Sequence, residues 1–347
     1  MKYNETIMYK EINEQASALN KMRDTLSDEL IKIKNAVTKN GVTNVVTAAR
    51  GSSNNACTYF KYLCEIYCSL PVSSSAPGVL TMYNGKLKYD SKTLCIGVSQ
   101  SGKAADAIRV MQQAKLNGAV TVAITNNCDS PMAKAADFHL FLGVGEEKSV
   151  AATKTFTAQM FVFLLLSEVL SGDRILTNAI KNIPNGIKTV LTDSEKISQT
   201  AIKLKDLQTA FILGRGLNYC AALESCLKMQ ETTYTMAKAY PSSDFHHGPF
   251  AMVDKNSTVF LIMPKGESFK DLSEMKDKCE KAEGRTIVYT DSNIKGNFDT
   301  ITIPSGTDIE TPFYSVVATQ LLVNSLSVLR GISPDAPRGL NKITITV

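Results

Sequence analysis

The chain has 347 residues, of which 44% are hydrophobic, which is enough for a buried core and for two domains of ordinary size. Lys and Arg exceed Asp and Glu by 38 to 33, giving a formal net charge of +5, and no basic cluster supports nucleic-acid binding. The N-terminus lacks the apolar core of a signal peptide, the apolar run 161–166 is too short to cross a bilayer, and the eight cysteines form no CxxC pair. We expect a soluble cytoplasmic protein with reduced thiols and with no membrane or nucleic-acid partner.

The first half of the chain alternates between strand and helix patterns. Apolar residues spaced mostly three and four apart over 8–37 predict one or two amphipathic helices that end at Asn40 and Gly41. A turn at residues 50–53 follows the first strand, and a polar loop over 143–152 precedes a long apolar helix. Strands are predicted at 44–49, 72–76, 93–99, 120–125 and 138–142, and helices at 54–69, 103–116 and 153–170. This alternation predicts a parallel sheet covered by helices on both faces.

The second half repeats the first. Residues 47–52 (TAARGS) match residues 212–217 (ILGRGL), with Arg50 and Arg215 in corresponding positions, which indicates an internal duplication. The helical stretch between the halves is interrupted by the sequence PNG at 184–186 and reads as a connection. Later strands are predicted at 210–213, 258–263, 286–289 and 301–303, with helices at 268–282 and 312–330. The predicted fold is two tandem α/β domains, divided into a helical segment 1–40, a first domain 41–172, a connection 173–207, a second domain 208–332 and a tail 333–347 that is either disordered or docked at a site.

A glycine turn after the strand 93–99 offers backbone N–H groups to an anion. The hydroxyls of Ser99 and Ser101, the backbone around Gln100 and the dipole of the following helix would point at one spot, which suits a phosphate without a metal. A serine that caps the helix and binds no ligand fits the same residues. The turn at residues 214–216 (GRG) has the same position after a strand.

Residues 213–250 hold the largest concentration of chemically reactive side chains. Glu224, Lys228 and Glu231 are spaced four and three apart, so they share one helix face. Spacing alone favours a solvated ion pair between Glu224 and Lys228. The sequence HHGP at 246–249 is less easily structural, because a turn closed by Gly-Pro does not need imidazole. An acid, an amine and an imidazole together indicate proton-transfer chemistry.

Five motifs in order resemble one known family. They are SQSG at 99–102, VAATK at 150–154, ALESCLKMQE at 222–231, HHGP at 246–249 and APRGLNK at 336–342. From about residue 40 to the end, the chain resembles the isomerase half of glucosamine-6-phosphate synthase, which is a tandem pair of sugar isomerase (SIS) domains. The resemblance implies a flavodoxin-like or Rossmann-like three-layer sandwich in each domain, with no metal and no cofactor.

The resemblance also implies a site for a hexose 6-phosphate. Glu231 stands at the position of the family's acid/base glutamate, His247 at that of the ring-opening histidine, and Lys342 at that of the tail lysine that can form a Schiff base with an open-chain ketose. A homodimer is implied as well, with the histidine segment near the site of the partner. The implied substrate-binding residues are Gly51, Ser52, Ser53, Ser99, Gln100, Ser101, Ala104, Val150, Ala152, Glu224, Lys228 and Asn341.

The sequence also departs from the synthase. Ala104 replaces a phosphate-binding threonine, Lys103 replaces an acid, and Gln230 replaces a lysine beside Glu231. No glutaminase counterpart is present, so we do not expect the protein to use glutamine by itself. Stand-alone relatives of this size resemble amino-sugar-phosphate deaminases and fructosamine-6-phosphate deglycases. The leading hypothesis is an isomerase and deaminase of glucosamine 6-phosphate; the alternatives are a deglycase of the fructoselysine type and a sugar-phosphate sensor without activity.

Overall fold

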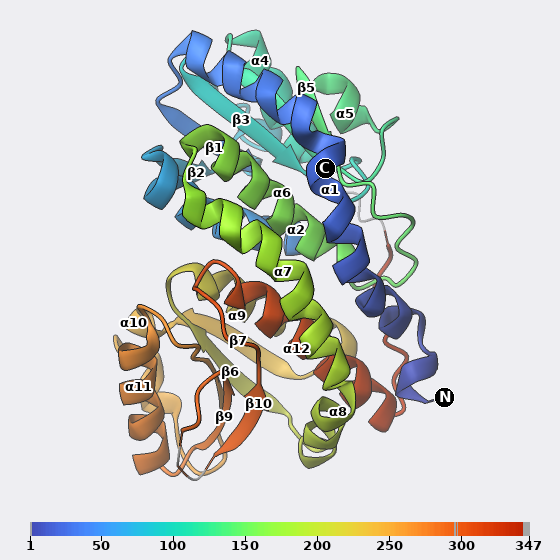
Figure 1. Cartoon of the computed structure of the whole chain (residues 1–347), viewed down its shortest axis with the longest axis vertical. Coiled ribbons are helices and arrows are strands. Elements are labelled where there is room, and N and C mark those ends of the chain that lie inside the picture. The colour runs from blue at the N-terminus through green and yellow to red at the C-terminus, as the bar shows by residue number, and fades with distance from the viewer. Residues whose placement is uncertain (1, 295, 297, 343–347) are drawn as a thin grey trace. The chain divides into compact units, whose positions relative to one another are not determined.

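A computed structural model describes residues 2–294, 296 and 298–342 (Figure 1). The chain divides into two compact units, and each is treated by itself. The first-sheet unit contains Ser17–Glu147, Lys154–Ile180, Asn341 and Lys342. The second-sheet unit contains Met1–Ala16, Lys148–Thr153 and Lys181–Leu340, of which Met1 and residues 295 and 297 lie outside the described residues. Residues 343–347 of the predicted tail also lie outside them.

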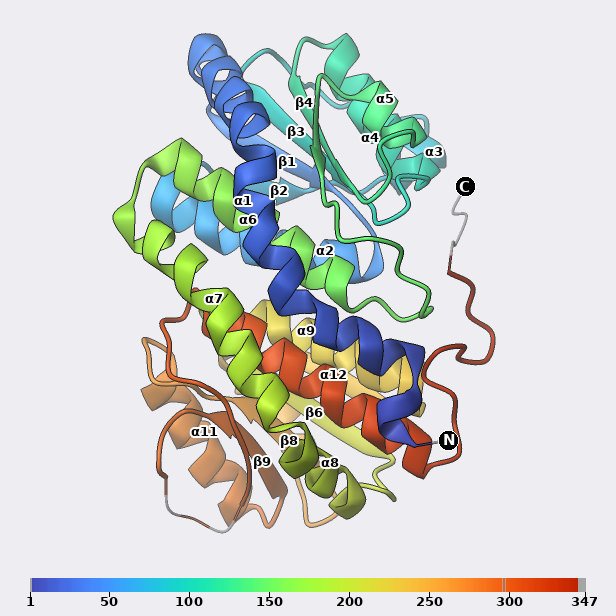
Figure 2. The same ribbon diagram turned by 45° about the vertical axis from the view of Figure 1, so that its right-hand side comes forward.

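The first-sheet unit is built on five parallel strands in the order β2-β1-β3-β4-β5. Every residue of β3 and β4 is buried, because helices cover both faces of the sheet. In Figure 2, α3, α4 and α5 lie on one side of this sheet and α2 and α6 on the other. The strands are β1 Asn44–Ala48, β2 Val72–Ser74, β3 Thr93–Val98, β4 Val120–Thr125 and β5 Phe138–Phe141, and the helices are α1 Ile7–Asn40 from Ser17 onward, α2 Gly51–Leu63 with a π-helical end at Cys64–Cys68, α3 Gly78–Thr81, α4 Ala105–Leu116, α5 Pro131–Ala135 and α6 Lys154–Ser171.

The second-sheet unit has the strand order β10-β9-β8-β6-β7, again all parallel. Figure 1 shows α10 and α11 on one side of this sheet and α9 and α12 on the other. Its elements are β6 Thr209–Gly214, β7 Met236–Pro241, β8 Thr258–Ile262, β9 Arg285–Thr290, β10 Asp299–Thr302, α7 Arg174–Thr192 from Lys181 onward, α8 Ser194–Lys203, α9 Tyr219–Thr233, α10 Ser242–Phe245, α11 Phe269–Lys281, α12 Thr311–Leu329 and the short turns Tyr3–Glu5, Gly216–Asn218 and Pro249–Met252. The two predicted parallel sheets are therefore confirmed.

The two sheets repeat one another in detail. Counted along the chain, both have the order 2-1-3-4-5, which is the flavodoxin-like arrangement. After the first strand of each sheet an extended arginine precedes a glycine of positive φ, +52° at Gly51 and +57° at Gly216. Each arginine then pairs with an aspartate in the first turn of a helix, Arg50 with Asp106 and Arg215 with Asp271. These shared features support the duplication that the sequence indicates.

Two sequence predictions of local structure are wrong. Helix α2 begins at Gly51 rather than at residue 54, because the extended Arg50 is already its N-terminal flank, so the predicted turn at 51–53 is the first turn of the helix. Helix α7 does not break at Pro184. Its inner face at Ile183, Ile187 and Val190 is buried, and this packing outweighs the backbone hydrogen bond that a proline cannot make. Strand β7 and the short helix α5 were not predicted.

Helix α7 has a glycine at position 186, where a neighbouring ring occupies the space that a side chain would fill. A Cβ on Gly186 would lie 2.1 Å from the ring of Tyr314 in α12. The glycine therefore permits close approach of the two helices.

Two helices of the described chain, α6 and α12, are long and apolar enough to cross a membrane by length and composition. Most of each is buried within the fold, as in the core helices of globular proteins. Their apolar character is therefore weak evidence for a membrane span.

Candidate functional site

A polar pocket of about 480 Å³ lies at the carboxyl ends of β3, β4 and β5 in the first-sheet unit. Open parallel sheets bind ligands at this edge of the strands. The lining contains two amines, two acids and three amides, which suits a polar ligand. The lining residues are Gln100, Ser101, Lys103, Asn126, Asn127, Phe141, Gly145, Glu146, Glu147 and Lys342.

The turn after β3 contributes Gln100 and Ser101 to this pocket, whereas Ser99 is not among its lining residues. Gly102 N donates to Ser99 Oγ at 3.1 Å and Lys103 N donates to Ser101 Oγ at 3.3 Å. Because each hydroxyl oxygen already accepts a hydrogen bond, its own hydrogen is available to an acceptor such as a phosphate oxygen. Gly102 has a φ of +65° and a Cβ there would lie 2.2 Å from Ser130 Oγ, so only glycine fits this turn.

The structure tests one of the two roles left open for these serines, that of a helix cap. Helix α4 begins at Ala105, and its N-cap is Ala104, which makes no side-chain cap. Neither Ser99 nor Ser101 is the N-cap, so the interpretation of the turn as a helix cap without further purpose is wrong. Their hydroxyl oxygens instead accept from backbone N–H groups within the turn.

The predicted residues Gly51, Ser52 and Ser53 lie at the end of β1, the strand beside β3. They do not line the pocket at the ends of β3 to β5. Ser53 is buried, and its Oγ lies 3.1 Å from Nε2 of Gln159, a buried residue of α6 that sequence analysis did not single out. Arg50 Nε lies 2.7 Å from Asp106 Oδ2 and so connects the end of β1 to the start of α4.

The tail lysine and a buried glutamate meet in the pocket. Lys342 Nζ lies 2.8 Å from Glu147 Oε2, and the side chain of Lys342 is 25% exposed whereas that of Glu147 is fully buried. Glu147 Oε2 also accepts from Thr155 Oγ1 at 2.7 Å, and Oε1 accepts from Thr155 N at 3.0 Å. Sequence analysis missed Glu147; the available signal was an acid just ahead of a helix N-terminus, where a carboxylate can accept from backbone N–H groups.

Within the second-sheet unit, the segment of the polar loop that follows Glu147 is held by the two ends of the chain. The carboxylate of Glu11 in α1 accepts from the backbone N–H groups of Lys148 and Ser149. Val150 N donates to the carbonyl of Asp335, whose carboxylate in turn accepts from the first N–H groups of α1. Of the predicted binding residues here, Val150 and Ala152 are half-buried.

The three residues of α9 form a buried charged group in the second-sheet unit. Lys228 Nζ lies 3.4 Å from Glu224 Oε1 and 2.5 Å from Glu231 Oε2. The side chains of Lys228 and Glu224 are 1% and 0% exposed, so the solvated pair that spacing favours is wrong. Glu231 is 22% exposed and is the carboxylate of this group that a ligand can reach.

The histidine segment follows β7 and α10. His246 and His247 are both exposed, and His247 N donates to the carbonyl of Asp244. The neighbouring carboxylate of Asp271 accepts from Ser242 Oγ and pairs with Arg215 at 2.6 Å. Partial burial raises the pKa of Asp271, but these hydrogen bonds and the positive charge of Arg215 outweigh it and lower the pKa overall. The contacts of Asp271 with Ser242 and Arg215 connect α11 to the start of the histidine segment.

The turn after β8 corresponds to the serine turn after β3, but carboxylates of the chain occupy it. Lys265 N donates to Asp291 Oδ1 at 2.8 Å, and the backbone of Glu267 donates to the carboxylate of Asp308. A Cβ on Gly266 would lie 2.3 Å from Asp308 Oδ1. The second sheet therefore fills its own anion-binding turn.

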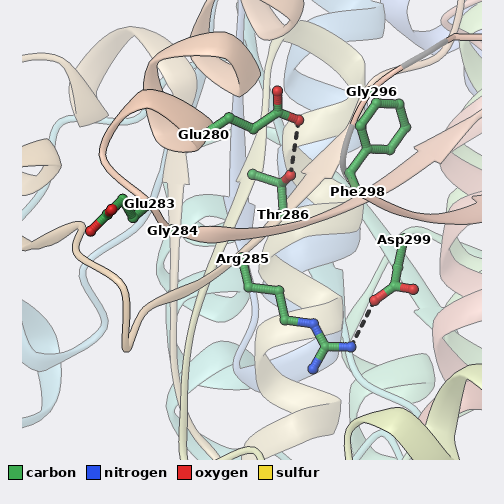
Figure 3. A pocket seen from close by; sticks show the side chains of 8 residues that line it. All are labelled: Glu280, Glu283, Gly284, Arg285, Thr286, Gly296, Phe298 and Asp299. Carbon is green, nitrogen blue, oxygen red and sulfur yellow. Dashed lines mark hydrogen bonds and ion pairs between the residues drawn. The ribbon is translucent and has the colours of Figure 1, made fainter.

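A second pocket, of about 650 Å³, lies at the amino ends of strands in the second sheet (Figure 3). It surrounds the first residues of β9 and β10, where Arg285 pairs with Asp299 at 2.7 Å and Thr286 contacts Glu280. These are the amino ends of the strands, the wrong edge for a ligand in a parallel sheet. Arg285 is paired with Asp299 and Glu280 with Lys276, so we assign this pocket no catalytic role.

No group of three or more His, Cys, Asp or Glu residues is arranged to hold a metal ion within residues 2–294, 296 and 298–342. Asn341 is exposed beside Lys342. The structure thus brings Gln100, Ser101 and Lys342 together in one pocket and Glu224, Lys228 and Glu231 together on one helix.

Comparisons with known proteins agree with the repeated architecture. The family model for the SIS domain matches residues 41–168 and again residues 203–330. The chain is 32% identical over 357 residues to a glutamine–fructose-6-phosphate aminotransferase (isomerizing) of Aquifex aeolicus, covering 98% of this chain but only 57% of the relative. The C-terminal domain of glucosamine-fructose-6-phosphate aminotransferase from Francisella tularensis has a TM-score of 0.85 at 25% identity, covering 96% of this chain and 98% of that one. Glucosamine-6-phosphate deaminase from Thermotoga maritima shares the fold, with a TM-score of 0.76 at 22% identity over 98% of this chain and all of that one.

Proposed function

The chain belongs to the SIS-domain family, and from that premise we propose that it is a phosphosugar isomerase and deaminase. The proposed substrate is glucosamine 6-phosphate or a close relative, which reacts with water to give fructose 6-phosphate and ammonia. The names of the aminotransferase and the deaminase described above contain fructose 6-phosphate and glucosamine 6-phosphate, which supports the choice of substrate.

The observation that carries the proposal is the composition of the pocket at the ends of β3 to β5. Gln100 and the neutral hydroxyl of Ser101 in this lining suit a phosphate, and the primary amine of Lys342 lies in the same pocket. A primary amine beside a phosphate site suits a phosphorylated sugar with a carbonyl group, because the amine can attack that carbonyl. In the proposed mechanism Glu231 moves the proton between C1 and C2, and His247 donates to the ring oxygen as the ring opens.

The test is ammonia release by purified protein from glucosamine 6-phosphate, with fructose 6-phosphate measured in the same samples. Equal release from glucosamine without the phosphate would contradict the phosphate-binding role of the serine turn.

A deglycase is the second candidate, because Ala104 and Gln230 replace residues that bind phosphate or flank the acid/base glutamate in the synthase family. Fructoselysine 6-phosphate distinguishes it: a deglycase releases lysine from this substrate and no ammonia from glucosamine 6-phosphate. Binding of either compound without turnover would favour a sensor. The homodimer remains a prediction, tested by sedimentation of the purified protein.

A further inference from the structure

We propose that Glu147 is a positioning residue that holds Lys342 in the pocket and accepts the proton that Lys342 must release before it attacks a sugar carbonyl. The proposal rests on the function proposed above and extends it to a residue that no motif identified. Its basis is the 2.8 Å ion pair between Lys342 Nζ and Glu147 Oε2 in a pocket that also contains Ser101.

The surroundings of Glu147 fix the direction of its carboxylate. Thr155 donates to both carboxylate oxygens from the start of α6, through its backbone N–H and its hydroxyl. These bonds hold a fully buried side chain on a rigid helix end, whereas its partner Lys342 comes from the tail. A buried charged carboxylate is costly unless it is paired and hydrogen-bonded. Glu147 therefore favours the position of the tail in which Lys342 contacts it.

The same contact supplies the proton acceptor that the chemistry needs. An ammonium group is not a nucleophile, so Lys342 must first pass a proton to Glu147 Oε2. The free electron pair of Nζ then attacks the carbonyl carbon of the open-chain ketose, forming the C–N bond while the carbonyl π electrons move to oxygen, and a proton from nitrogen neutralises this oxygen. Glu147 returns its proton to the resulting hydroxyl, which leaves as water. The products are an iminium ion on Lys342, one water and the original carboxylate.

The experiment compares Glu147→Gln with wild type by trapping the imine. Borohydride is added with fructose 6-phosphate, and the mass gain on the peptide that contains Lys342 is followed with time. The amide keeps an acceptor for Thr155 but cannot take a proton, so trapping should slow at least tenfold. Binding of glucitol 6-phosphate, which has no carbonyl group, should stay within about twofold by calorimetry. Trapping at the wild-type rate would overturn the proposal, as would an equal loss of glucitol 6-phosphate binding, which would mark Glu147 as merely structural.

Asp129→Asn is the control, because Asp129 is an exposed carboxylate of the same unit that does not line the pocket, and the substitution removes one negative charge. It should trap the imine at the wild-type rate; slowing equal to that of Glu147→Gln would refute a specific role for Glu147.

A second measurement separates this proposal from the proposed function. Digestion with trypsin depends neither on sugar chemistry nor on the nucleophilicity of the amine, and the exposed Arg338 in the same tail provides the internal reference. Trypsin must bind the free side chain of Lys342, so cleavage after Lys342 should be several-fold faster in Glu147→Gln than in wild type, relative to cleavage after Arg338. If wild type traps no sugar phosphate but this acceleration appears, the proposed function fails while the pairing of Glu147 with Lys342 stands. Unchanged cleavage after Lys342 would overturn the pairing itself.

Discussion

Replacement of Lys228 by methionine should strongly destabilise the second-sheet unit. The change keeps most of the side-chain volume but removes the ammonium group that contacts the carboxylates of Glu224 and Glu231. Breaking a buried ion pair by removing one partner costs about 3–5 kcal/mol. Glu224 is fully buried and carries most of this cost, whereas the partly exposed Glu231 is stabilised by solvent. For a unit of this size, about 1 kcal/mol changes the Tm by roughly 2–4 °C, so the loss should be on the order of 6–20 °C.

Differential scanning calorimetry of three variants tests this reasoning. Lys281→Met on the exposed surface of α11 is the control and should leave the Tm nearly unchanged. The double variant Glu224→Gln with Lys228→Met also removes the buried negative charge of Glu224 and should recover roughly half of the lost stability. A Tm change below about 2 °C in Lys228→Met would mean that the charged group is solvated. A double variant less stable than the single one would mean that the cost is not electrostatic.

Four further outcomes are expected. Glu231→Gln should lose on the order of 10²–10⁴ in turnover and the C1/C2 proton exchange seen by NMR, while still binding substrate; persistent exchange would refute its role. Ser101→Ala should weaken glucosamine 6-phosphate binding about tenfold by calorimetry without a large Tm change. Gly186→Ala should lower the free energy of unfolding in urea by about 1–3 kcal/mol, because the new methyl group meets Tyr314. Because the pKa of Asp271 is lowered in the folded state, its carboxylate contributes stability above the unfolded-state pKa of about 3.9, and this stability is lost as pH falls through the folded pKa. Asp271→Asn should therefore be less stable than wild type at pH 7 in urea titrations, and the two should converge as pH falls below about 4.

The sequence predicted the elements whose pattern depends on burial alone. Strands β3 and β4 are continuous apolar runs because both faces of the sheet are covered, and no other local structure explains such runs. Strand β7 was missed because it lies at the edge of its sheet, with Met236 and Lys238 exposed, and so lacks that pattern. Pro184 is the opposite case, where tertiary packing outweighs a local signal.

The candidate site was predictable only where residues form a continuous motif. The serine turn and the spacing of Glu224, Lys228 and Glu231 can be seen in the sequence, although the burial of the charged group cannot. Glu147 and Lys342 lie 195 residues apart, so their contact exists only after folding. No pattern of sequence spacing can reveal such a pair.

The carboxylates of Asp291 and Asp308 in the turn after β8 have a consequence for competition by small anions. An anion attached to the chain is present at an effective concentration that dilution and dialysis cannot change. In the turn after β3 the serine hydroxyls accept from N–H groups of the turn itself, so under the proposed function this turn draws its anion from the medium. Phosphate or sulfate in a buffer would therefore compete with a sugar phosphate at the first turn and leave the second turn unaffected, and each chain would bind one phosphorylated ligand in spite of its duplicated architecture.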